Sequence, residues 1–302
     1  MAVPMQSFRL TGSTVVVAVV ALLLSVAGTA VAQTVPDQVP GQVLEAGKAV
    51  AVTTTAANPA AANPADAFTA ATFDGLPYRL LAPESTGDDG TADADAKYPL
   101  VLFLHGAGER GNDNVAQLKH GAAEFLRPDR RQAYPAYVVM PQCPKDARWV
   151  ESDWGTASGD GAFPQAPSGP MAKALALVDH LADTLPVDPN RIYVTGLSMG
   201  GQGTWYAAVA PPKRFAAMLE VCGGGDPSWA HRYDGVPVWA FHGQSDSVVP
   251  VLRGREMIKA LAQSGHYPEL RYTEYPGVGH DSWTRTYSRD DVFDWLFRQS
   301  KN

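Results

Sequence analysis

One serine lies in a glycine-rich stretch that directly follows an apolar run. Residues 195–205 read TGLSMGGQGTW and come after RIYV. Glycines two positions before and two positions after Ser198 allow a strand to turn sharply into a helix, which leaves the serine hydroxyl accessible at the bend. The G-x-S-x-G pattern in this setting predicts a nucleophilic serine. A flexible loop is the alternative interpretation of the same glycines.

A serine hydroxyl is a poor nucleophile until a base takes its proton, and two later segments could supply the base and its partner. The segment FHGQSDSVVP places Asp246 after an apolar run, and YPGVGHDSW places His280 after the last such run. The chain order serine, acid, histidine is that of the α/β-hydrolases. We predict that Ser198, His280 and Asp246 form a catalytic triad, with Asp226 in GGGDPS as the alternative acid.

Acyl transfer also needs hydrogen-bond donors fixed in advance for the developing oxyanion. One donor is expected at the backbone N–H of Met199, the residue after the nucleophile. The second is expected in the loop LHGAGERGN, where we assign it to Ala107. The predicted chemistry requires no cofactor, and no spacing of His, Cys and Asp residues suggests a metal site.

The remaining histidines fall into two groups by their place in the pattern. His105 and His242 end apolar runs, which favours structural roles for both side chains. A solvated surface role is the default for the others, which are His120, His180, His231 and His266.

Apolar runs alternate with helical patterns over residues 67–302. FTAATF and LPYRLL, joined by Asp74-Gly75, predict a hairpin. Runs that are apolar on both faces, as buried strands must be, are YPLVLFLHG, AYVVMPQ, NRIYVTG, FAAMLEV and PVWAFHG, and ELRYTEY reads as a strand near an edge. Helical patterns cover residues 170–185, 200–210, 254–264 and 290–299. The alternation predicts one α/β domain with a mostly parallel central sheet and helices on both faces. Too few residues separate FAAMLEV from PVWAFHG for a large cap domain.

The first 66 residues have a different character. Arg9, the apolar run at 15–24 and the Ala-Val-Ala at 30–32 predict a signal peptide over residues 1–32. The alternative, a membrane anchor, would need about 20 apolar residues. Residues 33–66 are rich in Ala, Thr, Pro and Asn and predict a flexible lead-in, whose last residues could join the first strand. We therefore expect a secreted or periplasmic protein without stable membrane insertion after cleavage.

The charge balance excludes some partners. The 302 residues include 24 basic and 31 acidic groups, for a net charge of −7, and no basic cluster occurs. This balance argues against nucleic acid or an anionic membrane as the main partner. The oligomeric state is left open by the sequence.

Six segments together resemble one group of enzymes. They are LFLHGAGERGNDN, PQCP, GLSMGGQGTW, CGGGDP, HGQSDSVVP and YPGVGHDSW. In this combination the chain is similar, over roughly residues 75–300, to secreted esterases of the α/β-hydrolase superfamily. The nearest groups are the polyhydroxybutyrate-depolymerase and feruloyl-esterase-like proteins, the predicted extracellular peptidases close to them, and the phospholipase/carboxylesterase group. The resemblance implies that Ser198, Asp246 and His280 match the family triad, and Ala107 and Met199 its oxyanion donors.

The implied fold bears on the two cysteines, Cys143 and Cys222. In that fold, two other strands separate the strands that precede them. Three steps of about 4.8 Å make roughly 14 Å, which is beyond the reach of a disulfide. We predict two unpaired, mostly buried thiols.

The long segment 142–169 is the candidate for substrate contact, because long loops in compact domains are usually functional. We predict that it borders the active site and offers Trp149 or Trp154 as an aromatic platform, with Trp283 as a further candidate near His280. Packing of these rings against the body of the protein is the alternative.

The whole pattern favours an exported serine carboxylic-ester hydrolase. A bulky or polymer-linked ester is the expected substrate, either a feruloyl or acetyl group on polysaccharide or a polyester oligomer. A serine peptidase with the same triad is the second hypothesis, and a non-catalytic binding module is the third.

Overall fold

The computed structural model describes residues 63–84, 96–155, 162–265 and 269–301. The chain divides into two units, Met1–Asp37 and Gln38–Asn302, and every described residue belongs to the second. The predicted signal peptide (1–32) and most of the predicted lead-in (33–66) lie outside the described residues. The end of the lead-in forms the short helix α1 (Pro64–Ala67), which Asn63 caps by accepting a hydrogen bond from the Ala65 N–H. It does not join the first strand.

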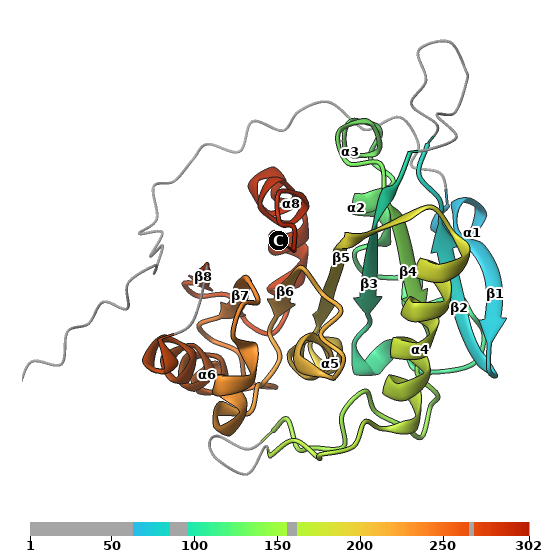
Figure 1. Ribbon diagram of the computed structural model, residues 1–302. Helices are drawn as coiled ribbons and strands as arrows, with labels where there is room; N and C mark the ends of the chain where they lie inside the picture. The colour runs from blue at the N-terminus through green and yellow to red at the C-terminus, as the bar shows by residue number, and fades with distance from the viewer. Residues whose placement is uncertain (1–62, 85–95, 156–161, 266–268, 302) are drawn as a thin grey trace, which may run out of the picture. The chain divides into compact units, whose positions relative to one another are not determined.

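Eight strands form one sheet in the order β1-β2-β4-β3-β5-β6-β7-β8 (Figure 1). Strands β1 and β2 pair antiparallel, β2 also pairs antiparallel with β4, and all the other pairings are parallel. The strand bounds are β1 (Thr69–Phe73), β2 (Leu76–Leu81), β3 (Tyr98–Leu104), β4 (Tyr137–Pro141), β5 (Val187–Leu197), β6 (Ala217–Val221), β7 (Val238–Gly243) and β8 (Leu270–Tyr275). Each strand coincides with a predicted one to within a few residues.

Helices follow the strands as the alternation predicts, and the 3₁₀ helices lie in two connections, from β3 to α2 and from β6 to β7. The α-helices are α2 (Ala122–Phe125), α3 (Pro128–Ala133), α4 (Gly169–Thr184), α5 (Met199–Val209), α6 (Val251–Ser264), α7 (Trp283–Tyr287) and α8 (Asp290–Phe297). The 3₁₀ helices are η1 (Ala107–Glu109), η2 (Ala116–Leu118) and η3 (Pro227–Tyr233). The connection from β6 to β7 contains only η3, so no cap domain is inserted there.

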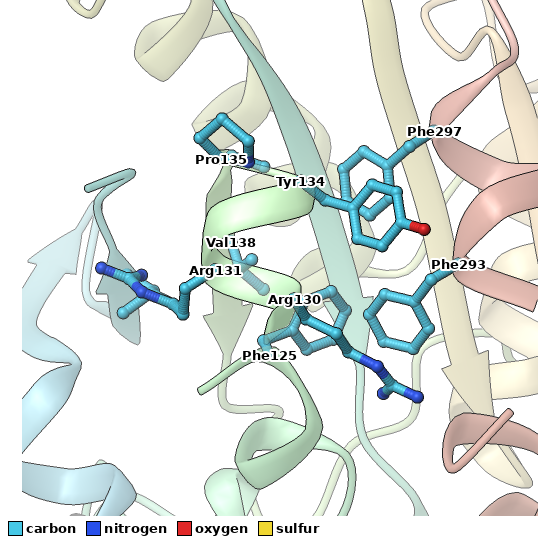
Figure 2. Close-up of a pocket in the computed structure, with 10 residues that line it drawn as sticks. Phe125, Arg130, Arg131, Tyr134, Pro135, Val138, Phe293 and Phe297 are labelled. Carbon is cyan, nitrogen blue, oxygen red and sulfur yellow. The ribbon is translucent and has the colours of Figure 1, made fainter. Parts of the chain in front are cut away.

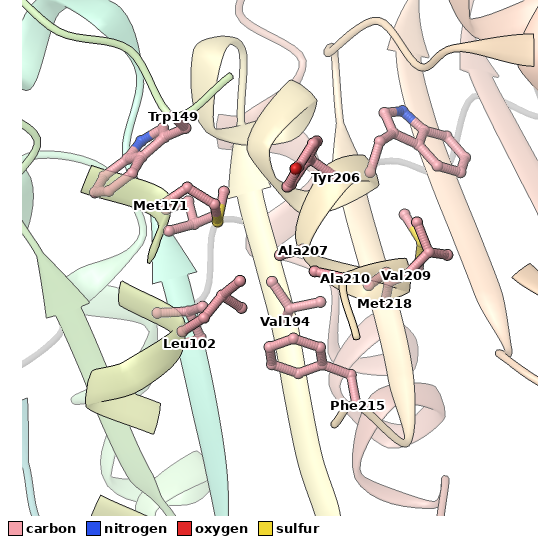
Figure 3. Close-up of a cluster of buried hydrophobic side chains, with 14 of the residues drawn as sticks. Leu102, Trp149, Met171, Val194, Tyr206, Ala207, Val209, Ala210, Phe215 and Met218 are labelled. Atoms are coloured by element: carbon pink, nitrogen blue, oxygen red, sulfur yellow. The ribbon is translucent and has the colours of Figure 1, made fainter. Parts of the chain in front are cut away.

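Side-chain alternation along the strands builds a core on each face of the sheet. Leu100, Leu102 and Leu104 of β3 belong to the buried cluster that includes residues of α4, α5 and α6. Val101 and Phe103 point the other way, into the cluster that includes residues of α2 and α8. Figure 3 shows the first cluster, where α4 and α5 pack on the strands. Burial of each such side chain contributes about 1.5–3 kcal/mol, so these two layers fix the sheet that carries the site.

The first hairpin turns as its residues predict. Asp74 and Gly75 both have positive φ, at 46° and 74°. Two consecutive residues with positive φ are typical of the type I′ turn, whose twist matches that of the flanking strands. Asp-Gly supplies this conformation at low cost.

The bend from β5 into α5 depends on close backbone approach. Ser198 adopts φ 55° and ψ −119°, and its N–H donates to Val221 O of β6 at 2.9 Å. A methyl group on Gly196 or Gly200 would overlap the carbonyl oxygen of Leu104 at the end of β3. The two glycines flanking the serine therefore allow α5 to begin against the carboxyl end of β3.

We predict that Gly200→Ala lowers the free energy of unfolding by about 3 kcal/mol or more, because the new methyl group must displace packed backbone. Urea-induced unfolding followed by circular dichroism measures the change. Gly169→Ala is the matched control, because its methyl group would meet no atom within 4 Å. Equal stability of the two variants would contradict the packing argument.

Candidate active site

Three side chains from three different loops form a continuous hydrogen-bonded chain. Ser198 Oγ lies 2.8 Å from His280 Nε2, and His280 Nδ1 lies 2.7 Å from Asp246 Oδ2. Ser198 follows β5, Asp246 follows β7 and His280 follows β8, so all three occupy the carboxyl end of the parallel sheet. The structure thus brings together the three residues that the sequence singles out. Asp226, the alternative acid, instead caps η3 and accepts from Phe163 N at 2.8 Å.

Asp246 is held as a buried anion. Burial by itself would raise its pKa, but hydrogen bonds involving His242, His280 and the Val248 N–H outweigh burial and keep the pKa well below its usual range. Its Oδ1 accepts from the N–H groups of Val248 and Val249 at 2.9 and 3.0 Å. The carboxylate is therefore ionised and fixed by backbone donors.

The charge on Asp246 decides the proton positions in the chain. An ionised carboxylate can only accept, so the Nδ1–H of His280 must donate to Asp246. In the neutral imidazole, Nε2 is then the free acceptor that faces the hydroxyl of Ser198. This tautomer is the one in which a histidine can act as a general base toward serine.

The loops that carry the acid and the base are tied to each other. Ser245 N–H donates to Val278 O at 2.8 Å, and a methyl group on Gly243 would overlap the carbonyl oxygens of Val278 and Gly279. The absence of a side chain at Gly243 therefore lets the two loops approach closely. This contact fixes the separation between Asp246 and His280.

The two predicted oxyanion donors occupy equivalent places in their segments. Met199 is the first residue of α5 and Ala107 is the first residue of η1, so neither backbone N–H has a partner within its own helix. The residues that lead into these two segments lie close together: a methyl group on Gly106, just before Ala107, would lie 2.9 Å from Cδ1 of Leu197, which precedes Ser198. The geometry is compatible with the assignment of both N–H groups to an oxyanion hole.

His105 supports the loop that carries Ala107. Its Nε2 accepts from Cys143 N–H at 2.9 Å, and its Nδ1–H donates to Gly106 O at 2.7 Å. Burial lowers the pKa of His105 from 6.5 to about 4, against the raising effect of the Gly106 hydrogen bond. The ring is therefore neutral near pH 7. His242 is likewise buried, and its Nε2–H donates to Val249 O at 2.9 Å, so both histidines have the structural surroundings expected of them.

Ser198 and His280 open into a pocket of about 290 Å³. Its walls are Gly106, Ala107, Gly108, Glu109, His120, Trp154, Leu197, Ser198, Val248, His280 and Trp283. A smaller pocket lies elsewhere, between α3 and α8, and is drawn in Figure 2. That pocket holds only about 10 Å³, room for one water molecule at most, and contains none of the three residues of the chain.

The three predicted tryptophans have different fates. Trp149 is fully buried, and its Nε1–H donates to His105 O at 3.0 Å. The expectation that Trp149 offers a platform is wrong, because the ring packs in the core and braces the His105 loop. Trp154 and Trp283 both line the pocket. The Trp283 and His280 rings are nearly perpendicular, with centroids 5.3 Å apart, and Arg148 Cζ lies 4.1 Å from the centroid of the Trp154 ring.

Two polar side chains of the pocket were not predicted as site residues. Glu109 lies within the quoted loop LHGAGERGN, so its place beside the predicted oxyanion donors could have been inferred from the same motif. His120, expected to be a solvated surface group, is half-buried and lines the pocket instead. Nothing in its local pattern indicates this, because the contact arises from tertiary folding.

Both cysteines are unpaired and buried, as predicted. Burial raises the pKa of Cys143 to about 12 and that of Cys222 well above its usual range. Cys222, Asp246 and His280 bring potential metal-ligand atoms within 4.8 Å of one another. Two of these residues are already bonded to each other, because His280 Nδ1 lies 2.7 Å from Asp246 Oδ2. The residues of this group are better suited to the hydrogen-bonded chain than to a metal.

A family model described as Phospholipase/Carboxylesterase matches residues 165–289, which contain Ser198, Asp246 and His280. The match agrees with the α/β-hydrolase fold of the chain and with the resemblance that its motifs carry. None of the described helices combines the length and the apolar character needed to cross a membrane.

Three known proteins illustrate the similarity. A "Probable feruloyl esterase C" of Aspergillus flavus is 28% identical over 193 residues, which cover 64% of this chain and 65% of that protein. An "Uncharacterized secreted protein" of Arthroderma benhamiae is 26% identical over 224 residues, which cover 62% of this chain and 22% of that protein. A solved structure, that of a thermostable esterase, has a TM-score of 0.69 and is 40% identical, covering 78% of this chain and 64% of that one. This chain thus spans less than two thirds of the length of each.

We predict that His105 makes the protein less stable as the pH falls from 6.5 to about 4. In this window the unfolded chain binds the proton and the folded chain does not, so the free energy of unfolding decreases with falling pH, by about 3 kcal/mol in total for this group. The stabilisation is fully present above pH 6.5. Urea unfolding measured at several pH values tests this.

His105→Asn should give a shallower decrease over the same window, because it removes the titrating ring. His180→Asn, at an exposed position on α4, is the matched control and should leave the slope unchanged. A wild-type slope retained in His105→Asn would assign the acid sensitivity to other groups.

Proposed function

We propose that the protein is an exported serine hydrolase of carboxylic esters. The observation that carries this proposal is the hydrogen-bonded chain from Ser198 through His280 to Asp246, open to a pocket. An ester hydrolase needs an activated hydroxyl, a base held in one tautomer and an accessible site, and these three residues supply all of them. The similarity to esterases supports the choice of esters over other acyl compounds.

In the proposed reaction, Ser198 Oγ attacks the carbonyl carbon while His280 Nε2 takes the hydroxyl proton. Asp246 orients the imidazole and stabilises the imidazolium that forms. The backbone N–H groups of Met199 and Ala107 stabilise the oxyanion of the tetrahedral intermediate. His280 then passes the proton to the leaving alcohol, and a water molecule activated by the same ring releases the acyl group from the serine.

The pocket walls favour a bulky ester. Trp154 and Trp283 offer aromatic faces beside the nucleophile, and Val248 is 48% exposed at the same pocket. These side chains could hold an aromatic or aliphatic acyl group. We infer that the ester is linked to a polymer, because no cap domain is inserted between β6 and β7 to limit access to the pocket.

We also infer that residues 1–32 direct export and are then removed, and that residues 33–66 join the signal to the catalytic part. The sequence pattern of residues 9–32 and the similarity to a protein named as secreted support this inference. Sequencing the N-terminus of the protein collected outside the cell tests it. A mature chain that retains residue 1 would contradict it.

We predict that Ser198→Ala lowers kcat for ester hydrolysis by about ten-thousand-fold or more, because the nucleophile is lost while the pocket remains. The measurement compares wild type and variant on p-nitrophenyl acetate, methyl ferulate, acetylated xylan and hydroxybutyrate oligomers.

Trp154→Ala in the same panel of esters should raise KM for methyl ferulate, the aromatic ester, more than for p-nitrophenyl acetate.

A peptide anilide completes the panel. Faster turnover of the anilide than of every ester would favour the serine peptidase alternative. If wild type shows neither hydrolysis nor labelling of Ser198 by a fluorophosphonate, the binding-module alternative takes precedence.

A further inference from the structure

We propose that Glu109 and His120 form a polar subsite of the pocket that binds a hydroxyl group carried by the ester substrate. The inference rests on the proposed ester hydrolysis and adds the kind of ester that the pocket selects. Four observations carry it: the burial of the carboxylate, its lack of hydrogen-bond donors, its link to His280, and the apolar nature of the remaining walls.

The Glu109 carboxylate is enclosed beside the oxyanion loop. Its side chain is only 7% exposed, yet it lines the same pocket as Ser198 and His280. A methyl group on Gly106 would lie 3.0 Å from Glu109 Oε2. The glycine therefore leaves the space that the carboxylate occupies, immediately before the proposed donor Ala107.

The carboxylate has little to satisfy it. Over the described ranges of the chain, no hydrogen bond reaches either oxygen of Glu109, and the side chain paired with it is that of His120, whose Nε2 lies 3.6 Å from Oε1. A carboxylate oxygen that accepts from no donor of the protein can accept from a donor brought by a ligand. A hydroxyl group entering the pocket would supply such a donor.

The polar pair lies one aromatic ring away from the reacting centre. The His120 ring packs on Trp283 with centroids 5.3 Å apart, and Trp283 in turn meets His280 at 5.3 Å. Trp283 therefore lies between His120 and His280, while Glu109 lies beside the oxyanion loop. A hydroxyl group on the acyl or alkoxy part of an ester bound at Ser198 would meet the Glu109–His120 pair within the same pocket.

The chemistry of the walls narrows the class of ligand. The pocket has two ionisable side chains besides that of His280, which are Glu109 and His120. Leu197 and Val248 are apolar walls of the same pocket. A carboxylate repels an anionic substituent and accepts from a neutral hydroxyl. A methoxy group has no proton to donate, so it would leave the carboxylate unsatisfied.

The test compares matched methyl esters at two lengths. The long set is 4-hydroxycinnamate, 4-methoxycinnamate and 4-(aminomethyl)cinnamate, and the short set is 3-hydroxybutyrate and 3-methoxybutyrate. For wild type we expect kcat/KM to favour the hydroxyl ester over its methoxy partner by about 10- to 100-fold in one of the two sets, as for a hydrogen bond to a charged group. The ratio of the two kcat/KM values is taken within each variant, so a general loss of activity affects both esters equally and does not change the ratio.

Glu109→Met removes the acceptor and should bring this ratio to about 1, whereas Glu109→Gln, which keeps an acceptor oxygen without the charge, should give an intermediate ratio. If the Met variant does not fold, the Gln variant decides alone. Glu151→Gln, at an exposed position outside the pocket, is the matched control and should keep the wild-type ratio.

A wild-type ratio below about 3 in both sets overturns the subsite, as does a wild-type ratio that persists in the Glu109 variants. Preference for the aminomethyl ester over the hydroxyl ester would assign the site to a cation and overturn the hydroxyl assignment. The proposed function fails separately: Ser198-dependent hydrolysis of p-nitrophenyl acetate without any hydroxyl preference refutes the subsite alone, and no hydrolysis of any ester refutes both.

Discussion

The close contact between the start of α5 and the end of β3 is the constraint on which the site depends. Side chains at Gly196 or Gly200 would overlap Leu104 O, so the bend can form only where both residues lack one. The bend gives Ser198 its positive φ and places the N–H of Met199 at the helix start. Leu104 leads directly into the loop of Ala107, so the same contact positions Ser198, the proposed nucleophile, and both proposed oxyanion donors.

A second feature is the contrast between Asp246, whose charged form is stabilised, and two buried acidic groups near it. Glu220 and Cys222, at the end of β6, are fully buried, and burial raises the pKa of each well above its usual range. Burial thus disfavours the charged forms of Glu220 and Cys222, whereas hydrogen-bond donors favour the charged form of Asp246. The negative charge that the surroundings of His280 favour is therefore that of Asp246, the carboxylate proposed to orient the imidazole.

The sequence predicted most of the fold, because each core strand is apolar on both faces and each helix after it has an apolar side. It also singled out Ser198, Asp246 and His280, since loops that follow parallel strands meet at one edge of the sheet. It failed for Trp149, because an indole in a long loop has the same local pattern whether it is buried or exposed. It missed His120 as a pocket residue for a related reason: its neighbour Trp283 is distant in sequence.

The burial of Trp149 explains why Trp154 is the ring of this loop that reaches the pocket. Trp149 packs against Gly203 of α5, since a methyl group on Gly203 would lie only 2.9 Å from Trp149 Cβ. Beyond it, Gln202 Nε2 donates to Ser152 Oγ at 2.6 Å, and Arg253 Nη1 donates to Asp153 O at 2.5 Å. Each bond attaches the segment just before Trp154 to α5 or α6. The loop is therefore anchored on α5, the helix that begins directly after Ser198, so the same helix supports Trp154 at the pocket and Ser198.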